Sequence, residues 1–249
     1  MHKDIKFIYG GTFDPPHYGH LRPLQSTADL LGIPHIELMP AHVPALKSEV
    51  SASEHRVNML RHLVALDPRF TINTIETKQQ NTTYTVKTLQ QLKQLHPNTQ
   101  LVFIMGDDSL AHIHKWYHWQ QMFDYAHILV MTRPSTAHHS TIVASNLYKF
   151  RTEQGLLCDI VSSEMDDKSK LYLSSKLAPV NVVKQCDTNS AFMDIISTST
   201  AGNLWLVNNN TMALSSTSVR SRIAKQQDVS DLVPSTIVNY IKQHQLYNH

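Results

Sequence analysis

The stretch from residue 5 to residue 20 constrains the fold more than any other part of this chain. The apolar run Ile5–Tyr9 predicts a buried strand, and Gly10 and Gly11 then let the backbone turn tightly and approach a ligand closely. His17 and His20 lie where a helix is expected to begin, beside unpaired N–H groups and the positive end of the helix dipole. The pattern predicts a triphosphate cradle; the structural alternative is a glycine turn followed by a histidine-capped helix.

The composition is that of an ordinary globular protein. The 249 residues allow one large α/β domain or two small ones, and 41% are hydrophobic. A net charge of +2 gives no reason to expect nucleic acid or a membrane surface as a partner. No apolar run approaches the roughly 20 residues that span a bilayer. The start of the chain lacks a signal-peptide pattern, and Cys158 and Cys186 are isolated, so we expect a cytoplasmic protein.

Short apolar runs alternate with helical stretches, which predicts parallel strands joined by crossover helices. We expect strands at Ile5–Tyr9, His35–Met39, Phe70–Ile75, Leu101–Met105, His127–Met131 and Leu204–Val207. We expect helices at His17–Leu31, Ser53–Leu66 with Ser53 as N-cap, Thr83–Leu95, Ser215–Lys225 and Pro234–Gln245. The predicted fold is a single Rossmann-like α/β domain: a doubly wound, mostly parallel sheet with helices on both faces. Residues 156–200, rich in Ser, Thr, Asp and Lys, are interpreted as an inserted segment with partial order.

A second candidate phosphate site lies near the other end of the chain. Ser215, Ser216 and Thr217 fall at a predicted helix start, where their hydroxyls can hydrogen-bond either the backbone or phosphate oxygens. Arg220, one turn into the helix, can contact phosphate bidentately. The alternative is a serine-rich cap followed by a solvated arginine.

These segments carry a family resemblance. The stretch Gly10-Gly11-Thr12-Phe13-Asp14-Pro15-Pro16-His17-Tyr18-Gly19-His20 resembles the signature of the His-x-Gly-His nucleotidylyltransferase superfamily, in the version typical of nicotinate mononucleotide adenylyltransferases. Leu214–Arg220 is similar to that family's Ile-Ser-x-Thr-x-x-Arg motif. The resemblance implies AMP transfer from ATP, with Mg²⁺, to nicotinate mononucleotide, and His17, His20 and Arg220 as catalytic residues. The implied ATP-binding residues are Gly10, Gly11, Thr12, Phe13, His17, His20, Gly106, Asp108, Ser215, Ser216, Thr217 and Arg220.

The resemblance also implies a pyridine nucleotide site. Asp108 follows the strand that Gly106 ends, and is expected near sugar hydroxyls. Trp116 is expected to stack on the nicotinate ring, as suits a flat heterocycle. The implied residues for this substrate are Lys47, Tyr84, Thr85, Trp116, Tyr117 and Arg133. The structural alternative for these positions is a set of core aromatics and helix-capping threonines.

Two stretches depart from a simple match. The loop Pro40–Lys47 has Leu46 where relatives usually carry histidine and Ala41 at an often polar place, although Lys47 keeps a cation. The stretch His112–His118 is rich in histidine, but only His114 and His118 share a helix face and no nearby cysteine or carboxylate completes a zinc set, so no protein-held metal is expected.

Two other functions remain open at this point. One is a pantetheine-phosphate or cytidylyl transfer activity of the same superfamily. The other is a module that binds or senses a nucleotide without turning it over.

Overall fold

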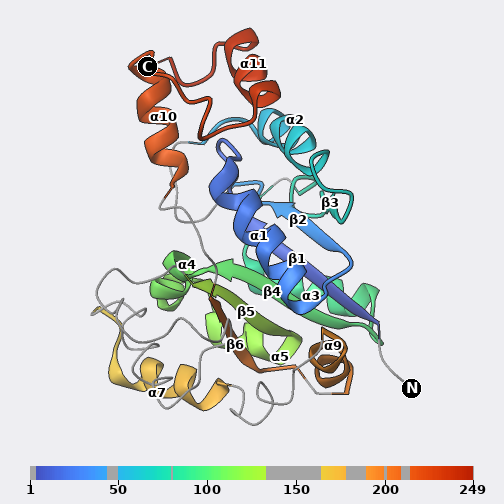
Figure 1. Cartoon of the computed structure of the whole chain (residues 1–249). Coiled ribbons are helices and arrows are strands. Elements are labelled where there is room, and N and C mark those ends of the chain that lie inside the picture. The colour runs from blue at the N-terminus through green and yellow to red at the C-terminus, as the bar shows by residue number, and fades with distance from the viewer. Residues whose placement is uncertain are drawn as a thin grey trace, which may run out of the picture.

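Among the residues that the structure describes, one six-stranded sheet organises the fold (Figure 1). The computed structural model describes residues 4–43, 50–79, 81–132, 164–177, 189–198, 201–208 and 214–248. The strands pair in the order β3-β2-β1-β4-β5-β6, and every pair is parallel. This is the doubly wound order in which a crevice opens where the winding reverses, here between β1 and β4. The predicted fold class is confirmed.

The elements follow the predicted alternation. The strands are β1 (Ile5–Gly11), β2 (Ile36–Pro40), β3 (Phe70–Ile72), β4 (Gln100–Gly106), β5 (Ala126–Thr132) and β6 (Leu204–Asn208). The α-helices in the described residues are α1 (Tyr18–Leu31), α2 (Ser53–Val64), α3 (Thr85–Leu95), α4 (Asp107–Ala111), α5 (Met122–Tyr125), α7 (Asp167–Lys176), α9 (Asn189–Thr198), α10 (Ser216–Ala224) and α11 (Ser235–Gln243). Two short 3-10 helices, Ile113–Lys115 and Trp119–Gln121, lie between α4 and α5.

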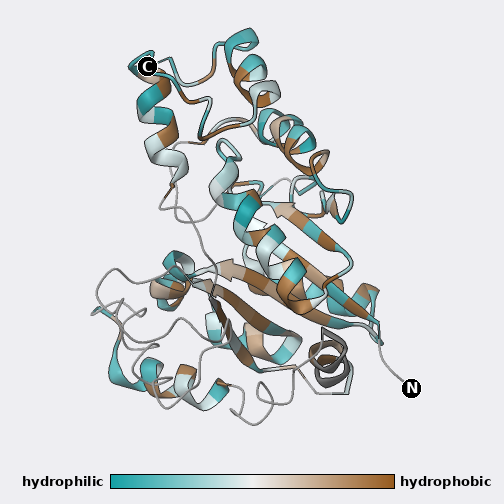
Figure 2. Cartoon of the chain, in the orientation of Figure 1, coloured by the Kyte–Doolittle hydropathy of each residue, from teal (hydrophilic) through white to brown (hydrophobic). Residues whose placement is uncertain are grey.

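Apolar runs become the central strands because helices cover both faces of the sheet. Every residue of β5 is buried, as are the first six of β4. Strands buried on both faces carry continuous rather than alternating apolar sequence. Figure 2 shows this as hydrophobic strands beneath helices whose outer faces are hydrophilic.

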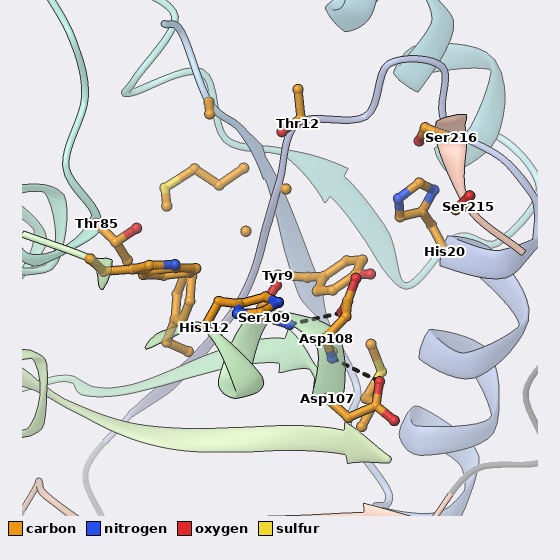
Figure 3. A pocket seen from close by; sticks show the side chains of 18 of the residues that line it. Tyr9, Thr12, His20, Thr85, Asp107, Asp108, Ser109, His112, Ser215 and Ser216 are labelled. Atoms are coloured by element: carbon orange, nitrogen blue, oxygen red, sulfur yellow. Dashed lines mark hydrogen bonds between the residues drawn. The ribbon is translucent and has the colours of Figure 1, made fainter. Parts of the chain in front are cut away.

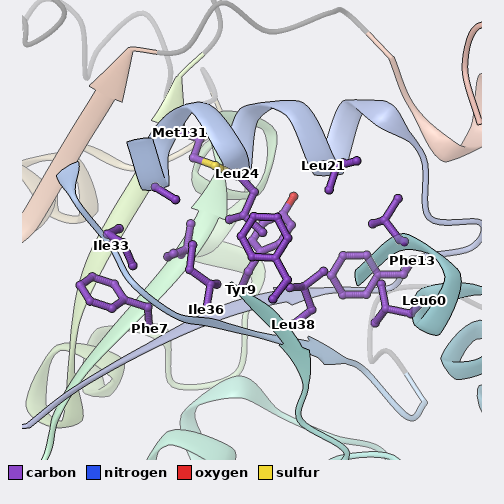
Figure 4. Packing of buried hydrophobic residues seen from close by; sticks show 14 of the residues in the cluster. Phe7, Tyr9, Phe13, Leu21, Leu24, Ile33, Ile36, Leu38, Leu60 and Met131 are labelled. Carbon is purple, nitrogen blue, oxygen red and sulfur yellow. The ribbon is translucent and has the colours of Figure 1, made fainter. Parts of the chain in front are cut away.

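Successive strand residues point to opposite faces and so feed two cores. On one face, Phe7 and Tyr9 pack with apolar residues of α1, α2, α9, α10 and α11 (Figure 4). On the other face, Ile8 packs with apolar residues of α3, α4, α5 and α7. The helices that follow β1 and β4 thus go to opposite faces, which opens the crevice at the carboxyl ends of these two strands.

Several predicted boundaries differ from the observed ones by one to three residues, and two of these differences have a clear local cause. Ser53 is the first residue of α2, not its cap: Ala52 is the cap residue and makes no side-chain capping hydrogen bond. The strand predicted over Phe70–Ile75 ends at Ile72. There Asn73 accepts a hydrogen bond from the Ile75 N–H at 3.0 Å, a local turn that competes with strand pairing.

The segment 156–200 contains α7 and α9, which pack on opposite faces of the sheet through Leu173 and Ile196. Within this segment, residues 156–163, 178–188 and 199–200, which include Cys158 and Cys186, lie outside the described part of the chain. Within the described residues, none of the helices combines the length and apolar character that crossing a bilayer requires.

Candidate active site

A cavity of about 750 Å³ opens where β1 and β4 end. Its wall comes from segments far apart in sequence, and most predicted site residues line it. These are Gly10, Gly11, Thr12, His17, His20, Tyr84, Thr85, Gly106, Asp108, Trp116, Tyr117, Ser215, Ser216 and Thr217. Figure 3 shows His20, Ser215 and Ser216 on one side and Thr85 on the opposite side, with Asp108 and Ser109 between them.

The two glycines at the end of β1 let the main chain itself line the cavity. A side chain at either position would collide with a phenylalanine ring. A Cβ atom on Gly10 would lie 2.5 Å from Cζ of Phe103, and one on Gly11 would lie 2.8 Å from Cζ of Phe13. Phe13 itself is buried and does not line the cavity. Its ring packs edge-on against His20 with the centroids 5.1 Å apart. Phe13 therefore supports the cradle from behind.

The two histidines of the first segment lie at the N-terminus of α1. His17 is the cap residue, and the Nδ1 atom of His20 accepts a hydrogen bond from the His17 N–H at 3.2 Å. The two rings stack loosely, with centroids 3.8 Å apart. His20 takes part in capping and still lines the cavity, so the capping interpretation and the phosphate interpretation are compatible.

Gly19 makes this arrangement possible. A Cβ atom at this position would lie 2.9 Å from the His17 ring and 3.0 Å from the Cβ of Leu214. Real Cβ atoms essentially never approach as closely as the first of these distances. The absence of a side chain at Gly19 thus lets the second predicted segment pack directly on the first.

The second segment closes this side of the cavity at the start of α10. Ser215 caps the helix by accepting the Ser218 N–H at 3.1 Å. The Ser216 hydroxyl donates to the carbonyl of Pro15, 201 residues away in the chain, at 3.1 Å. The two predicted phosphate segments therefore lie side by side and line the same cavity.

Arg220 lies behind this wall rather than in the cavity lining. Its Nη1 atom donates to the main-chain carbonyl of Asp14 at 2.7 Å, and its Nη2 atom donates to the Thr217 hydroxyl at 3.4 Å. In this conformation its guanidinium ties α10 to the loop after β1.

On the far side of the crevice, α4 begins directly after β4. Asp107 accepts the Asp108 N–H at 2.9 Å, and Asp108 accepts the Ser109 N–H at 3.0 Å (Figure 3). A Cβ on Gly106 would lie 2.5 Å from Oδ1 of Asp108, so this glycine is needed for the carboxylate to fold back over the helix start. The result places oxygen acceptors on the cavity wall.

Aromatic side chains gather on the same side. The rings of Tyr84 and Tyr117 lie 4.6 Å apart, and Nζ of Lys87 lies over both, at 5.4 and 5.5 Å from their centroids. Trp116 is partly buried and meets Phe103 edge-on, 6.4 Å between centroids. These rings give this end of the cavity flat apolar surfaces.

Several lining residues were missed by the sequence interpretation. The additional residues are Tyr9, Gly19, Pro23, Met39, Ala41, Glu76, Thr83, Val86, Phe103, Asp107, Ser109, His112, Lys115, Met122, Met131 and Leu214. His112 and Lys115 belong to the histidine-rich stretch His112–His118, of which only Trp116 and Tyr117 were assigned to a substrate. Lys115 forms an ion pair with Glu164 at 2.6 Å.

Glu76 is the most distinctive residue among these. It is 4% exposed and accepts a hydrogen bond from the Thr88 hydroxyl at 2.7 Å. Burial raises the pKa of Glu76, and the hydrogen bond from Thr88 opposes that shift. A lone glutamate in a loop gave no sequence signal, because its burial depends on packing against α3.

Two predicted residues, Lys47 and Arg133, lie outside the described residues, as does Leu46. Among the residues that are described, no group of three or more His, Cys, Asp or Glu side chains could hold a metal ion.

Comparisons with known proteins identify the family to which this chain belongs. The cytidylyltransferase-like family model matches residues 8–222, a span that includes both predicted phosphate segments. A protein of Aeromonas salmonicida named "Probable nicotinate-nucleotide adenylyltransferase" is 34% identical over 242 residues, which cover 96% of this chain and 95% of that protein. One with the same name from Idiomarina loihiensis is 30% identical and covers 98% of this chain and 99% of its own.

Solved structures agree on the fold. Nicotinic acid mononucleotide adenylyltransferase of Plasmodium falciparum, complexed with NaAD, superposes with a TM-score of 0.65 at 21% identity, over 99% of this chain and 98% of that one. The same enzyme complexed with APC gives a TM-score of 0.62. With the match to the family model and these two relatives, at 30% identity or more over nearly the full length of both chains, the chain belongs to the cytidylyltransferase-like family.

Proposed function

We propose that this protein transfers the AMP group of ATP to nicotinate mononucleotide, giving nicotinate adenine dinucleotide and pyrophosphate in NAD biosynthesis. The proposal rests on one observation, a cavity whose two sides carry different kinds of side chain. One side is lined by His17, His20 and the start of α10, the other by Trp116 and Tyr84. Full-length relatives that carry the name of this activity support it.

The histidine side suits a polyphosphate. Imidazole N–H groups, hydroxyls and the N-termini of α1 and α10 are all hydrogen-bond donors for phosphate oxygens. We assign the triphosphate to the space between His20 and Ser215–Thr217, with the main chain of Gly10 to Thr12 beneath the nucleoside. Arg220 uses one N–H for the carbonyl of Asp14 and one for the Thr217 hydroxyl, and its guanidinium has further donors for phosphate.

The aromatic side suits the pyridine nucleotide. Trp116 offers a face for the nicotinate ring, and Tyr84 and Thr85 lie at the start of α3, beside its first N–H groups. Asp108 provides acceptors for sugar hydroxyls. Lys47 and Arg133 are assigned to this substrate by the family resemblance alone.

The reaction needs positioning more than acid or base chemistry. A 5′-phosphate oxygen of nicotinate mononucleotide forms a bond to the α-phosphorus of ATP. The bond from the α-phosphorus to the bridging oxygen breaks in line, and pyrophosphate leaves with that oxygen. A phosphate monoester is already an anionic nucleophile near neutral pH. His17 and His20 are assigned to stabilising the charge that develops on the phosphate oxygens.

A divalent cation, Mg²⁺, accompanies ATP in this proposal. Mg²⁺ usually keeps several waters and binds through substrate phosphates with one or two carboxylates. The cavity fits that mode, because its wall carries the carboxylates of Asp107 and Asp108 without a cluster of three ligands among the described residues. When bound, the cation would neutralise phosphate charge.

An acceptor screen tests the proposal. The protein is incubated with ATP and Mg²⁺ and, in turn, nicotinate mononucleotide, nicotinamide mononucleotide and phosphopantetheine, with CTP as an alternative donor. We expect pyrophosphate release and nicotinate adenine dinucleotide, identified by mass, with kcat/KM highest for nicotinate mononucleotide. Faster turnover of phosphopantetheine or CTP would instead assign a different transferase activity. Binding of ATP without any turnover would indicate a nucleotide-binding module.

A further inference from the structure

A buried arginine lies beneath the cavity and belongs to neither group of residues assigned above. Arg56, on the first turns of α2, has no exposed surface. Its guanidinium donates three hydrogen bonds, all to main-chain carbonyls: Nε to Ser51 at 2.9 Å, Nη1 to Thr12 at 2.8 Å and Nη2 to His42 at 2.6 Å. A planar guanidinium offers donors in a fixed fork, so these bonds fix the relative position of the three carbonyls.

The three carbonyls belong to the two loops that build the cavity floor. Thr12 lies in the loop after β1 and lines the cavity. His42 follows Ala41, which lines the cavity and donates its N–H to the Gly11 carbonyl at 3.0 Å. Arg56 therefore joins the loop after β1 to the loop after β2 and to the segment leading into α2.

Two buried carboxylates act electrostatically on the same guanidinium. Burial lowers the pKa of Arg56 from its ordinary value, and the charges of Asp14 and Glu76 act against that shift. Asp14 is itself held, because it accepts the Ser51 N–H at 3.0 Å and the Tyr247 hydroxyl at 2.5 Å. Replacing buried charged groups by apolar ones is often neutral or stabilising, so stability alone is a weak reason for this arrangement.

We infer that Arg56 is a positioning residue: by holding the Thr12 and His42 carbonyls at once, it sets the loop after β1 in register with the loop after β2. The inference rests on the proposed function, in which the first loop lies under ATP and the second begins the stretch that leads to Lys47. In-line attack requires the two reactants to be aligned closely, and an error of about 1 Å can cost on the order of a hundredfold in rate. Ground-state binding is spread over many residues and depends less on this register.

The test compares Arg56→Lys and Arg56→Gln with Arg69→Lys. Arg69 is a matched control, because it also bonds through its guanidinium, to Asp67 at 2.7 Å and Asp29 at 2.6 Å, but lies before β3, away from the cavity. Lysine at position 56 keeps a positive charge near Asp14 but lacks the planar set of N–H donors that the guanidinium offers to the three carbonyls. Steady-state kinetics with ATP and nicotinate mononucleotide, expressed per folded protein by circular dichroism, give the first measurement.

For Arg56→Lys we expect kcat to fall about tenfold, and for Arg56→Gln about a hundredfold, with less than about a threefold change in the KM for either substrate. Arg69→Lys should leave kcat within twofold of the wild type. Full activity in Arg56→Lys, or equal losses at positions 56 and 69, would overturn the inference. So would failure of both Arg56 variants to fold, since the residue would then be required for folding itself.

A second measurement does not depend on turnover. Amide hydrogen exchange is followed in peptides that cover residues 9–14 and 38–43. We expect faster exchange in both peptides in Arg56→Lys and unchanged exchange in Arg69→Lys, because only the first variant frees the loops. If exchange in both peptides were unchanged in Arg56→Lys, positioning of the loops by Arg56 would be excluded. If the wild type turned over no substrate, the proposed function would fail while this measurement still decided the role of Arg56.

Discussion

At the scale of single residues, the two histidines of the signature segment differ in how much each contributes to the structure of the cradle as well as to its chemistry. His17 is 2% exposed and is packed by Gly19, so its removal would disturb structure as well as chemistry. His20 is partly exposed and lines the cavity beside Ser215 and Ser216. His20 is therefore the better position at which to measure stabilisation of the transition state.

We expect His20→Ala to lower kcat by a factor of about 10² to 10³, which corresponds to about 2.7–4 kcal/mol for one lost donor. The affinity for ATP should change little, because the donor acts mainly on charge that develops in the transition state. Steady-state kinetics and calorimetric titration of ATP provide the two measurements. His96→Ala, at the exposed end of α3, is the control and should retain wild-type kcat. A rise in KM alone for His20→Ala would contradict the assigned role.

At the scale of elements, strands and helices follow from apolar patterning, whereas site contacts depend on distant partners. The strands at Leu101–Met105 and His127–Met131 were predicted from runs that are buried on both faces, and the observed β4 and β5 contain them. The fold and the family predicted from the sequence are confirmed. Most predicted site residues line one cavity, because the doubly wound order brings strand ends together.

The features that sequence patterning did not predict are contacts between residues far apart in the chain. Arg56 shares the buried face of α2 with Leu60 and Leu63, but nothing local indicates its partner Thr12, 44 residues away. Arg220 was assigned to phosphate, and in the structure it bonds a carbonyl 206 residues away. Phe13 falls within the signature, yet its side chain turns away from the cavity to pack behind His20. None of these contact partners follows from local propensity or periodicity.

The pairing of β5 with β6 gives a prediction at the same scale. His127 on β5 is fully buried, stacks on Trp205 of β6 with ring centroids 5.4 Å apart, and accepts the Asn203 N–H at 3.3 Å. Burial, with a smaller effect of Lys93, lowers the pKa of His127 to about 4. In the unfolded chain the pKa is about 6.5. Between these values the unfolded state binds a proton that the folded state does not, so stability falls as the pH falls.

At pH 5 this linkage should cost about 2 kcal/mol relative to pH 7. His127→Gln keeps an acceptor for Asn203 and removes the titrating group. Urea unfolding at the two pH values should show a smaller loss of unfolding free energy in the variant than in the wild type, by about that amount. Parallel losses in the two proteins would show that His127 is protonated equally in the folded and unfolded states.

At the scale of the whole molecule, the C-terminal part of the chain completes the N-terminal cradle. In Figure 1, α10 and α11 lie beside the start of α1 and beside α2. Contacts from this part of the chain hold the signature segment at several points: Tyr18 N–H to Leu232, Ser216 to Pro15, and Arg220 to Asp14. The cavity therefore forms only when both ends of the chain are folded together.

The Tyr247 hydroxyl makes the last of these contacts. Its removal tests whether the C-terminal part of the chain completes the cradle. Tyr247 donates to the buried carboxylate of Asp14 at 2.5 Å, 233 residues away, and burial raises the pKa of the phenol above its ordinary value. Tyr247→Phe leaves Asp14 with one donor fewer, which should lower the free energy of unfolding by about 1–3 kcal/mol. Because Asp14 lies within the signature segment, we also expect kcat to fall.

Tyr240→Phe is the matched control for this prediction. The Tyr240 hydroxyl also joins the C-terminal part of the chain to α2, through Asn58 at 3.1 Å and His55 at 3.0 Å, but it does not touch the signature segment. We expect Tyr240→Phe to lower the free energy of unfolding in urea and to leave kcat within twofold of the wild type. If the two variants lost kcat equally for the same loss of stability, the C-terminal contacts would stabilise the fold without shaping the cradle. A loss of kcat confined to Tyr247→Phe would mean that the last residues of the chain act on the site through Asp14.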